Sequence, residues 1–307
     1  MCYTRFYGLE KCRLGRYNSL YSFLLPHLLS SGSRVRVLPG TPHCSKDNHC
    51  HLTESPERAR DTLNTRQHSL NENRIVILES MNEYFFRDQV SPLLMDKLWA
   101  QGWRHFGSYF FRYARFPKDG QVLHVQPLRV RLEHHTLNRS QKRTLKQNGD
   151  VDIVVKPAYI DNEVLQLFER HKTRFKDNVP ESLTTFLSER PAVKPCPCVS
   201  LCLRLNGELI GVSYLDVGQN ATSSVYQCFE PTLSKRALGI LMMLLCVQLS
   251  REAGKTFYYP GYAFREKSFY DYKKTLRGLE VYDWQDTWQP LDNHTKDTSK
   301  ANLKSKI

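Results

Sequence analysis

A nearly continuous apolar stretch in the second half of the chain has the spacing of a buried helix. Between Ala237 and Glu252, apolar residues recur at intervals of three and four, and most positions between them are apolar too. This pattern predicts a helix that is covered on almost every side. A helix of this length cannot span a bilayer. Gly254 follows the last turn, where glycine commonly ends a helix.

Strand-like segments flank this helix on both sides. Ser224–Phe229 is rich in β-branched and aromatic residues and stops before Pro231. Thr256–Tyr259 is the second segment, and we expect Pro260–Gly261 to end it. Because the connection is long enough for a crossover, the two strands are predicted to be parallel neighbours.

The turn before the helix carries polar and basic side chains, among them Ser234 and Arg236. Cations beside a helix N-terminus are typical of an anion site, which makes both residues candidates for substrate binding. The glycine-rich signal of a pyrophosphate loop is only half present in Arg236–Ile240. An ordinary helix-start turn therefore explains the pattern about as well.

Shorter patterns predict the remaining elements. Ser91 and Pro92 are typical of a helix start, and Asn206–Gly207 between alternating apolar runs is typical of a tight hairpin. The other predicted elements are an aromatic strand at Tyr109–Tyr113, an alternating strand at Gln126–Leu132, a strand at Val151–Lys156 and an amphipathic helix at Asp161–Lys172.

A basic helix is predicted at Thr136–Asn148, with Asn138 or Ser140 as its cap. Its cations are spaced three or four residues apart and share one face, which suits contacts with phosphate groups. An ordinary solvated face is the equal alternative. The candidate phosphate-binding residues are Arg139, Lys142, Arg143 and Lys146.

Composition makes a nucleic-acid partner more plausible. The 307 residues include 44 basic and 31 acidic ones, for a formal net charge of +13. Such an excess favours a polyanionic partner, although a merely soluble basic protein remains the alternative. The 40% of apolar residues is enough for a normal core, and no apolar run reaches the length of a membrane helix, so we expect no membrane partner.

Cysteine use indicates a reducing, cytoplasmic setting. The chain has nine cysteines, which is too sparse for a disulfide scaffold, and an odd number leaves at least one unpaired. Cys202 lies at a strand position, so Cys196, Cys198 and Cys202 are not expected to bind a metal. The cluster His43–His51 lacks the paired spacing of zinc ligands, and chance clustering is the favoured interpretation. We expect no metal and no cofactor.

Several motifs occur together in a specific order. They are Leu128–Arg131, Leu137–Arg143, Ser223–Tyr226, Phe229–Pro231, Leu238–Gly239, and Tyr258–Tyr262 with Lys267 and Tyr272–Lys273. In this order the chain, from about Met95 to Trp288, resembles the arginyl-tRNA–protein transferase family, the aminoacyl transferases of the N-degron pathway. The resemblance implies an α+β fold, with an N-acetyltransferase-like mixed sheet, flanking helices and a small N-terminal α+β region.

The chain departs from the family pattern at two places. The family carries paired cysteines in its N-terminal region, whereas Gly107–Pro127 contains none, and Glu230 stands where the family has an aspartate. These differences indicate a divergent branch without the N-terminal cysteine pairs.

The resemblance also implies a division of the chain. Residues 73–150 form an N-terminal transferase region and residues 151–290 an N-acetyltransferase-like domain. Residues 1–72 are expected to be disordered or a non-essential extension, with a targeting segment as an alternative and Met81 as a plausible true start. A short strand is expected at Arg74–Leu78, and residues 291–307 are expected to be a polar tail.

The activity implied is transfer of arginine from arginyl-tRNA to the N-terminal α-amino group of acceptor proteins, marking them for degradation. Its partners are aminoacyl-tRNA and acceptors with acidic N-termini. A leucyl-transferring relative, a coenzyme-A-dependent N-acetyltransferase and a non-catalytic tRNA-binding protein are the alternatives.

Roles for individual residues follow as hypotheses. Asp216 and Glu230, at strand ends, are the candidate catalytic carboxylates, with surface carboxylates as the alternative. Tyrosines are candidates for the slot that takes the terminal adenosine or aminoacyl group, with core packing as the alternative. Lys267 and Lys273 are candidates for holding the acidic side chain of the acceptor. The candidate tyrosines are Tyr226, Tyr259 and Tyr262, and Tyr272 joins the substrate-binding set through its motif.

Overall fold

The computed structural model describes residues 35–37, 83–176 and 179–291. The predicted strand at Arg74–Leu78, the cluster His43–His51 and the tail from residue 292 therefore lie outside the described residues. So does the predicted extension, apart from residues 35–37, which form an edge strand of the main sheet.

Within the described residues, ten strands form one large mixed sheet, in the order β1-β7-β8-β9-β10-β11-β6-β12-β13 with β5 paired to β6. A second sheet has three strands in the order β2-β4-β3. The strands of the large sheet are β1 (Val35–Val37), β5 (Arg115–Lys118), β6 (Gln121–Arg131), β7 (Asp152–Pro157), β8 (Cys198–Leu205), β9 (Glu208–Val217), β10 (Ala221–Phe229), β11 (Phe257–Phe264), β12 (Leu279–Tyr282) and β13 (Trp288–Pro290). Those of the small sheet are β2 (Glu83–Phe86), β3 (Arg104–Phe106) and β4 (Tyr109–Arg112).

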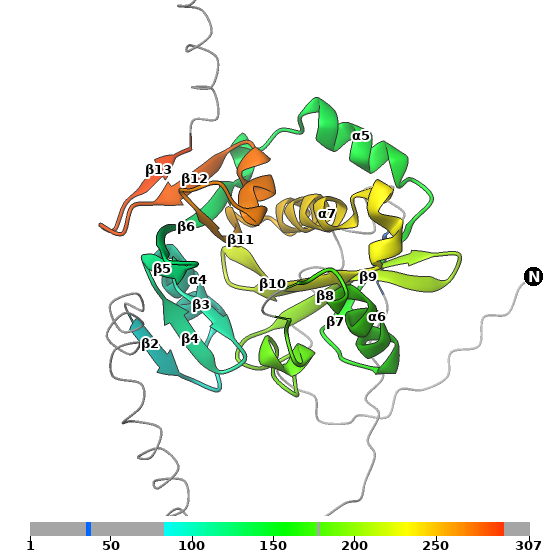
Figure 1. The fold of residues 1–307 in the computed structure, drawn as a ribbon, viewed down its shortest axis with the longest axis horizontal. Coiled ribbons are helices and arrows are strands. Elements are labelled where there is room, and N and C mark those ends of the chain that lie inside the picture. Colours follow the sequence, from blue (N-terminus) through cyan, green and yellow to red (C-terminus); the bar gives the residue numbers. More distant parts are fainter. Residues whose placement is uncertain (1–34, 38–82, 177–178, 292–307) are drawn as a thin grey trace, which may run out of the picture.

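Helices cover both faces of the large sheet (Figure 1). The buried helix α7 (Leu238–Glu252) lies on one face, with α5 (Arg139–Gln147) packed outside it, and α6 (Asn162–Lys172) lies on the other. Each face has its own apolar core, because side chains of the central strands alternate between the two faces. The remaining helical elements are α4 (Pro92–Ala100) and the 3₁₀ turns η1 (Leu132–His134), η2 (Leu183–Thr185), η3 (Pro231–Arg236) and η4 (Phe269–Thr275).

The α+β class and the central strand–helix–strand unit are confirmed. Helix α7 runs between β10 and β11, and the two strands pair in parallel, as the crossover length predicted. The hairpin at Asn206–Gly207 joins β8 to β9, and Asn206 adopts the positive φ of 52° that such a turn requires.

The predicted end of β11 is wrong. The strand continues through Pro260–Gly261 to Phe264. Its pairing with β6 shifts between Tyr258 and Gly261, so the proline lies in a bulge where no ladder hydrogen bond is required of it. Gly261 has a φ of 96°, which glycine adopts without the penalty other residues carry. The bulge redirects β11 instead of ending it.

The small sheet and α4 pack against the large sheet through a third apolar core, which contains Met95, Trp99 and Phe110. The two regions predicted on either side of residue 150 share the large sheet, because β6 lies between β11 and β12. This arrangement brings β3 and β4 next to the ends of β10 and β11.

Candidate functional site

The site begins where β10 and β11 part. The two strands are paired only from Ala221 to Ser223 and from Phe257 to Tyr259. Beyond these residues β10 shifts register against β9, and β11 shifts against β6. The parting strands leave backbone groups without a ladder partner, and such groups must be satisfied by something else.

Arg104 of β3 fills this fork between the strands. Its guanidinium donates one hydrogen bond to the Ser223 hydroxyl and another to the backbone carbonyl of Ser224. Burial lowers the pKa of Arg104, although Tyr262 and Asp216 act in the opposite direction. Among residues 83–176 and 179–291, no carboxylate lies within ion-pair distance of this guanidinium. Arg104 is therefore a partly buried cation without a direct counter-ion.

Lys273 of η4 reaches the same place from the opposite side. Its ammonium group donates to the Tyr262 carbonyl at 2.9 Å and lies over the Tyr270 ring at 4.9 Å. Burial, and then the positive charge of Arg104, lower the pKa of Lys273 to about 7. A Cβ atom on Gly261 would lie 3.3 Å from the Lys273 ammonium and 3.7 Å from the Arg104 guanidinium, so glycine makes room for both cations.

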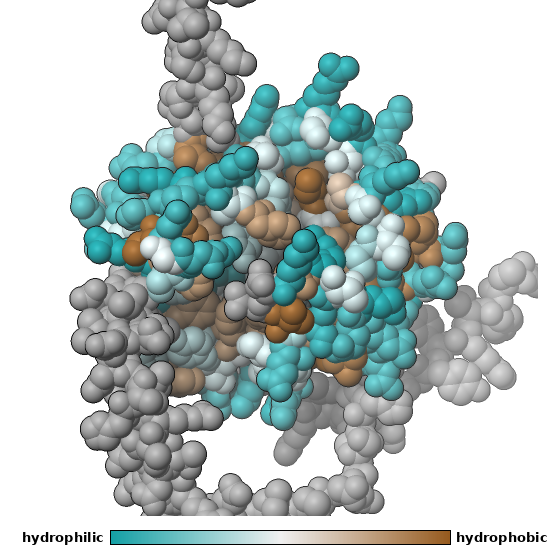
Figure 2. Space-filling view, viewed as in Figure 1, coloured by the Kyte–Doolittle hydropathy of each residue, from teal (hydrophilic) through white to brown (hydrophobic). Residues whose placement is uncertain are grey.

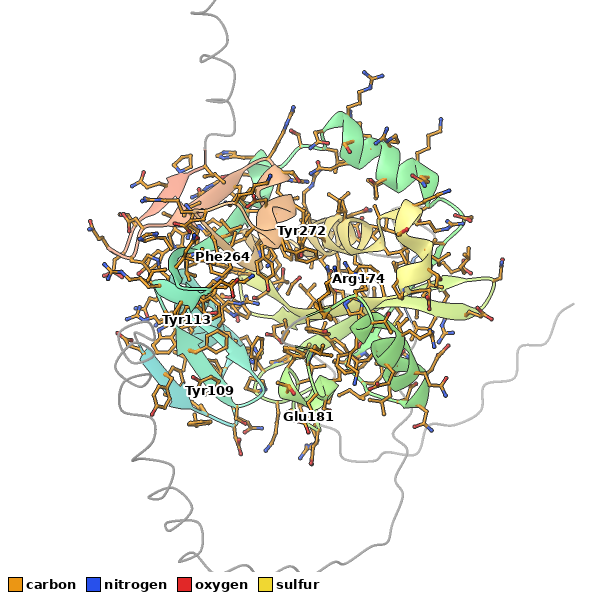
Figure 3. The ribbon with its side chains drawn as sticks, viewed as in Figure 1. Tyr109, Tyr113, Arg174, Glu181, Phe264 and Tyr272 are labelled. Atoms are coloured by element: carbon orange, nitrogen blue, oxygen red, sulfur yellow. The ribbon has the colours of Figure 1, made fainter. Side chains whose placement is uncertain are left out.

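Tyr113, which lies close to Arg104, and Tyr272, which precedes Lys273, lie around a hollow between the small sheet and the main body. Figure 2 shows that face of the molecule hollowed between the two parts. The side chains around it come from β4, β11, η4, the segment after α6 and the segment before η2 (Figure 3). Those labelled are Tyr109, Tyr113, Arg174, Glu181, Phe264 and Tyr272.

Asp216 has a buried, structural setting. It is 2% exposed, and its Oδ2 lies 2.6 Å from Nε2 of His105. The other ring nitrogen of His105 lies 3.0 Å from the Gly107 carbonyl. The pair thus ties β3 to β9, and the alternative of a surface carboxylate does not describe Asp216. The geometry gives Asp216 an anchoring position and leaves its catalytic role without support.

Glu230 is also occupied by partners within the protein. It caps η3 through the backbone amide of Thr232 and receives the Arg170 Nε at 2.6 Å. Burial acts to raise the pKa of Glu230, but the hydrogen bonds from Thr232 and Arg170 outweigh it, and the pKa is lowered. Glu230 is therefore held as a paired carboxylate, and its proposed catalytic role remains a prediction.

The four candidate tyrosines lie in different settings. Tyr259 packs in the third core between Trp99 and Trp288, with ring centroids 5.9 Å and 5.8 Å away. The Tyr262 hydroxyl donates to the Gly102 carbonyl at 2.5 Å. Tyr259 is therefore a core residue, as the alternative interpretation held. The other two, Tyr226 and Tyr272, lie closer to the hollow.

Tyr226 and Tyr272 both lie near Arg174. The Tyr226 ring stacks on Phe186 at 4.0 Å, and its buried hydroxyl has no hydrogen-bond partner among the described residues. Burial and the neighbouring Tyr270 raise the pKa of Tyr272 to about 12, and Arg174 acts against them. Figure 3 places Tyr272 and Arg174 beside each other at the hollow.

The turn before α7 does not form a free anion site. Arg236 is paired with both carboxylate oxygens of Asp150, at 2.8 Å and 2.9 Å, and the carbonyl of Ser234 accepts from the Ala237 amide. Gly239 in the first turn lies against the Phe229 ring, since a Cβ there would be 3.0 Å from it. Lys267 is exposed. Substrate roles for Ser234, Arg236 and Lys267 stay predictions.

The basic helix α5 forms as predicted, with Asn138 as its cap in a reciprocal capping box with Gln141. Gln141 and Thr144 are buried on the inward face. The four predicted phosphate-binding cations are exposed on the outward side, and no ion pair joins any of them to a carboxylate among the described residues. They are Arg139, Lys142, Arg143 and Lys146.

One cluster of potential metal ligands lies behind the fork. Atoms of His105, Cys196 and Asp216 all lie within 4.8 Å of one another, and all three residues are buried. Burial, the Asp216 charge and a hydrogen bond to Asp216 raise the pKa of the Cys196 thiol well above its usual range. Because these groups hydrogen-bond directly to one another, their proximity needs no metal to explain it.

Sequence reasoning missed Arg104, His105 and Arg174. Arg104 and His105 stand between Trp103 and Phe106, and charged residues in such an aromatic strand are a signal that they are paired or functional. Arg174 follows α6 without any pattern, and only the fold brings it to the hollow.

Comparison with known proteins identifies the family. Residues 163–283 match the family model described as "Arginine-tRNA-protein transferase, C terminus". The chain belongs to the aminoacyl-tRNA–protein transferase family. The matched residues include β10, α7, β11 and η4, and so contain both parting strands and Lys273. Family membership makes the chain an aminoacyl-tRNA transferase, as the motifs indicated.

Curated relatives of this family have a more specific name. The chain is 26% identical over 211 residues to an aspartate/glutamate leucyltransferase of Helicobacter hepaticus, covering 66% of this chain and 85% of the relative. It is 29% identical over 200 residues to one of Pseudoalteromonas atlantica, covering 63% of this chain and 82% of the relative.

Likeness to solved structures is weaker. The structure of L-PGS from Bacillus licheniformis has a TM-score of 0.36 at 15% identity, covering 52% of this chain and 60% of that one. A fungal GCN5-related glucosamine N-acetyltransferase region also has a TM-score of 0.36, at 12% identity over 62% of this chain and 21% of that one. In the described part of the chain, every helix is too short or too polar to cross a bilayer.

Proposed function

We propose that this transferase moves leucine from leucyl-tRNA to the N-terminal α-amino group of proteins that begin with aspartate or glutamate. The acceptor amine attacks the ester carbonyl that joins the amino acid to the tRNA. A peptide bond forms, the tRNA leaves with its terminal hydroxyl restored, and the amine gives up a proton. An ester is already activated, so the principal task of the protein is to hold the two reactants together.

The pair Arg104–Lys273 is the observation that supports an acidic acceptor. Both cations are partly buried at the fork, and no carboxylate pairs directly with either one among the described residues. Buried charges in proteins are normally paired, because an uncompensated charge is costly in a poorly solvated place. A carboxylate from the acceptor side chain would supply the missing negative charge, and Arg104 offers it the geometry of a planar donor.

The charge of the hollow favours leucine over the arginine expected from the resemblance. Arg104, Lys273 and Arg174 lie in or beside it, and Glu181 is the carboxylate labelled around it in Figure 3, so an arginyl side chain would add to a net positive charge. A leucyl side chain carries no such repulsion. The names of the curated relatives point the same way.

The exposed face of α5 supports binding of the tRNA body. Its four cations project from one side of the helix, where they can contact successive phosphates. A coenzyme-A-dependent activity has less support, because the turn before α7 lacks a complete glycine-rich loop and Arg236 is paired with Asp150.

Transfer of labelled leucine and labelled arginine, each from its own charged tRNA, tests the proposal. Model acceptors should begin with aspartate, glutamate or asparagine and be otherwise identical. We expect leucine to be incorporated into the two acidic acceptors and the asparagine acceptor to be much poorer. Arginine incorporation would overturn the choice of amino acid. Binding of tRNA with no transfer of either label would favour the non-catalytic alternative.

A further inference from the structure

We propose that Arg174 and Phe269 form a platform at the rim of the hollow for the single-stranded 3′ end of the tRNA, separate from the deeper Arg104–Lys273 pair. The inference rests on the proposed function, since it divides one hollow between the two substrates of that reaction. It assigns nucleotide binding to Arg174 and Phe269, two residues that lie outside the sequence motifs described above.

Arg174 is an exposed arginine held by aromatic rings instead of carboxylates. Its guanidinium lies over the Phe229 ring at 4.3 Å and faces the Phe269 ring at 5.9 Å. Among the described residues, no acidic group forms an ion pair with it. Partial burial lowers the pKa of Arg174, and Tyr272 and Tyr226 oppose that effect. The guanidinium is therefore oriented by stacking and keeps its hydrogen-bond donors available for a phosphate.

Phe269 presents exposed apolar surface beside this cation. It is 69% exposed at the start of η4, and its ring lies 5.9 Å from Tyr270 and 6.2 Å from Tyr272. Tyr270 is itself 41% exposed. An exposed aromatic ring next to an arginine is the arrangement by which proteins stack unpaired bases while neutralising the adjoining phosphate.

Tyr226 adds an unsatisfied polar group at the same place. Its hydroxyl is buried and has no hydrogen-bond partner among the described residues. Burial and Cys228 raise the pKa of Tyr226, and the nearby charge of Arg174 acts against them. A buried hydroxyl without a partner is uncommon, so a ligand group is the natural partner for it. Tyr226 would then contact the 3′ end of the tRNA, which is close to the predicted role in binding the terminal adenosine or aminoacyl group.

The platform also connects with the basic helix. The Gln147 side chain donates to the Lys235 carbonyl at 2.9 Å, and Asn148 donates to the Arg236 carbonyl at 2.9 Å, so the end of α5 is fixed to η3. Turn η3 begins two residues after Phe229, the ring on which Arg174 lies. A tRNA bound along α5 can thus reach the rim by way of η3.

Direct binding of a fluorescently labelled CCA trinucleotide, followed by anisotropy, tests the platform without requiring catalysis. We expect Arg174→Gln and Phe269→Ala each to weaken binding at least tenfold, and Arg174→Lys to restore it only in part because it loses the planar stack. Lys176→Gln and Phe86→Ala are the matched controls, because both residues are exposed and lie outside the platform. The melting temperature of each variant shows whether it is folded.

Steady-state kinetics separate the platform from the acceptor site. In the full transfer reaction, the two platform variants should raise KM for aminoacyl-tRNA at least fivefold and leave KM for the acceptor unchanged. Wild-type trinucleotide binding in both variants would overturn the proposal, as would a rise confined to KM for the acceptor, which would place the acceptor chain on the rim. If the wild-type protein binds CCA but transfers no amino acid, the proposed function fails while the platform stands.

Discussion

Burial decides what Lys273 can do. An exposed lysine stays charged well above neutral pH, but burial and the neighbouring Arg104 lower the pKa of Lys273 to about 7. Before an acceptor binds, the charge is therefore present below about pH 7 and absent above it. Since a carboxylate binds the charged form, its binding would raise this pKa again and take up a proton. The preference for acidic acceptors should accordingly depend on pH.

The ratio of kcat/KM for an aspartate acceptor to that for an asparagine acceptor should fall as pH rises from 6.5 to 8.5. The ratio cancels the titration of the acceptor amine, which both substrates share. We expect a decline that approaches about tenfold per pH unit at the upper end, where the charged fraction of Lys273 shrinks at that rate.

Lys273→Arg provides the control for this profile, because arginine keeps its charge throughout the range. In this variant the ratio of kcat/KM for the aspartate acceptor to that for the asparagine acceptor should not change with pH. It should still be greater than one. A total loss of transfer in a folded Lys273→Arg variant would instead indicate that the lysine acts as a base.

Asp216 contributes to the stability of the protein through its hydrogen bond to His105. Its buried bond to His105 joins β9 to β3, and removing one partner leaves the other uncompensated. We expect Asp216→Asn to destabilise the protein by about 3 kcal/mol, measured by denaturant unfolding. Below its unfolding transition the variant should retain transfer activity. A variant with full stability and no activity would contradict the anchoring position and support a catalytic one.

Among the elements, β11 shows where sequence patterns were sufficient and where they were not. Apolar spacing predicted α7, and the length of the connection predicted the parallel pairing of β10 with β11. Pro260–Gly261 looked like a strand end, because a bulge and a terminus use the same residues. Only the register against β6 distinguishes them, and register depends on a strand more than a hundred residues away.

The bulge can be tested through its glycine. Gly261→Ala should cost roughly 1 kcal/mol from the positive φ and should also raise KM for acidic acceptors, because the new Cβ would lie against Lys273 and Arg104. Gly207→Ala is a matched control, since Gly207 also has a positive φ but nothing lies near its Cβ position. Equal effects of both variants on acceptor KM would argue against the cation contact.

Helix α5 supplies the prediction for tRNA binding. Replacing Lys142, Arg143 and Lys146 with glutamine should weaken tRNA binding and reduce the salt dependence of log K by about 1 for each phosphate that the helix no longer neutralises. A triple variant at Arg87, Lys97 and Lys118, which are also exposed, changes the net charge equally and serves as the control. If the salt dependence of tRNA binding changes equally in the α5 variant and in the control variant, the effect comes from net charge and not from α5.

In the molecule as a whole, two sheets of different size enclose the site. The motifs identified the family, and the pattern of α5 identified a basic surface, because both are local properties of the sequence. The proximity of Arg104 to Lys273 could not be predicted. The two residues are far apart in sequence and come together only where β10 and β11 separate. Arg174 was missed for the same reason. The chemistry of the hollow depends on contacts between residues that are far apart in sequence. Hydrophobic periodicity does not reveal such contacts.

The most direct test is leucine transfer to aspartate and asparagine acceptors by the wild-type protein and by Arg104→Gln and Lys273→Met variants. Because Arg104 also fills the fork, the melting temperature of each variant should be measured alongside. We expect the wild type to prefer aspartate strongly and each folded variant to lose most of this preference, chiefly through KM for the aspartate acceptor. Undiminished preference for aspartate in folded variants of both residues would contradict the claim that this partly buried pair of cations selects the acceptor.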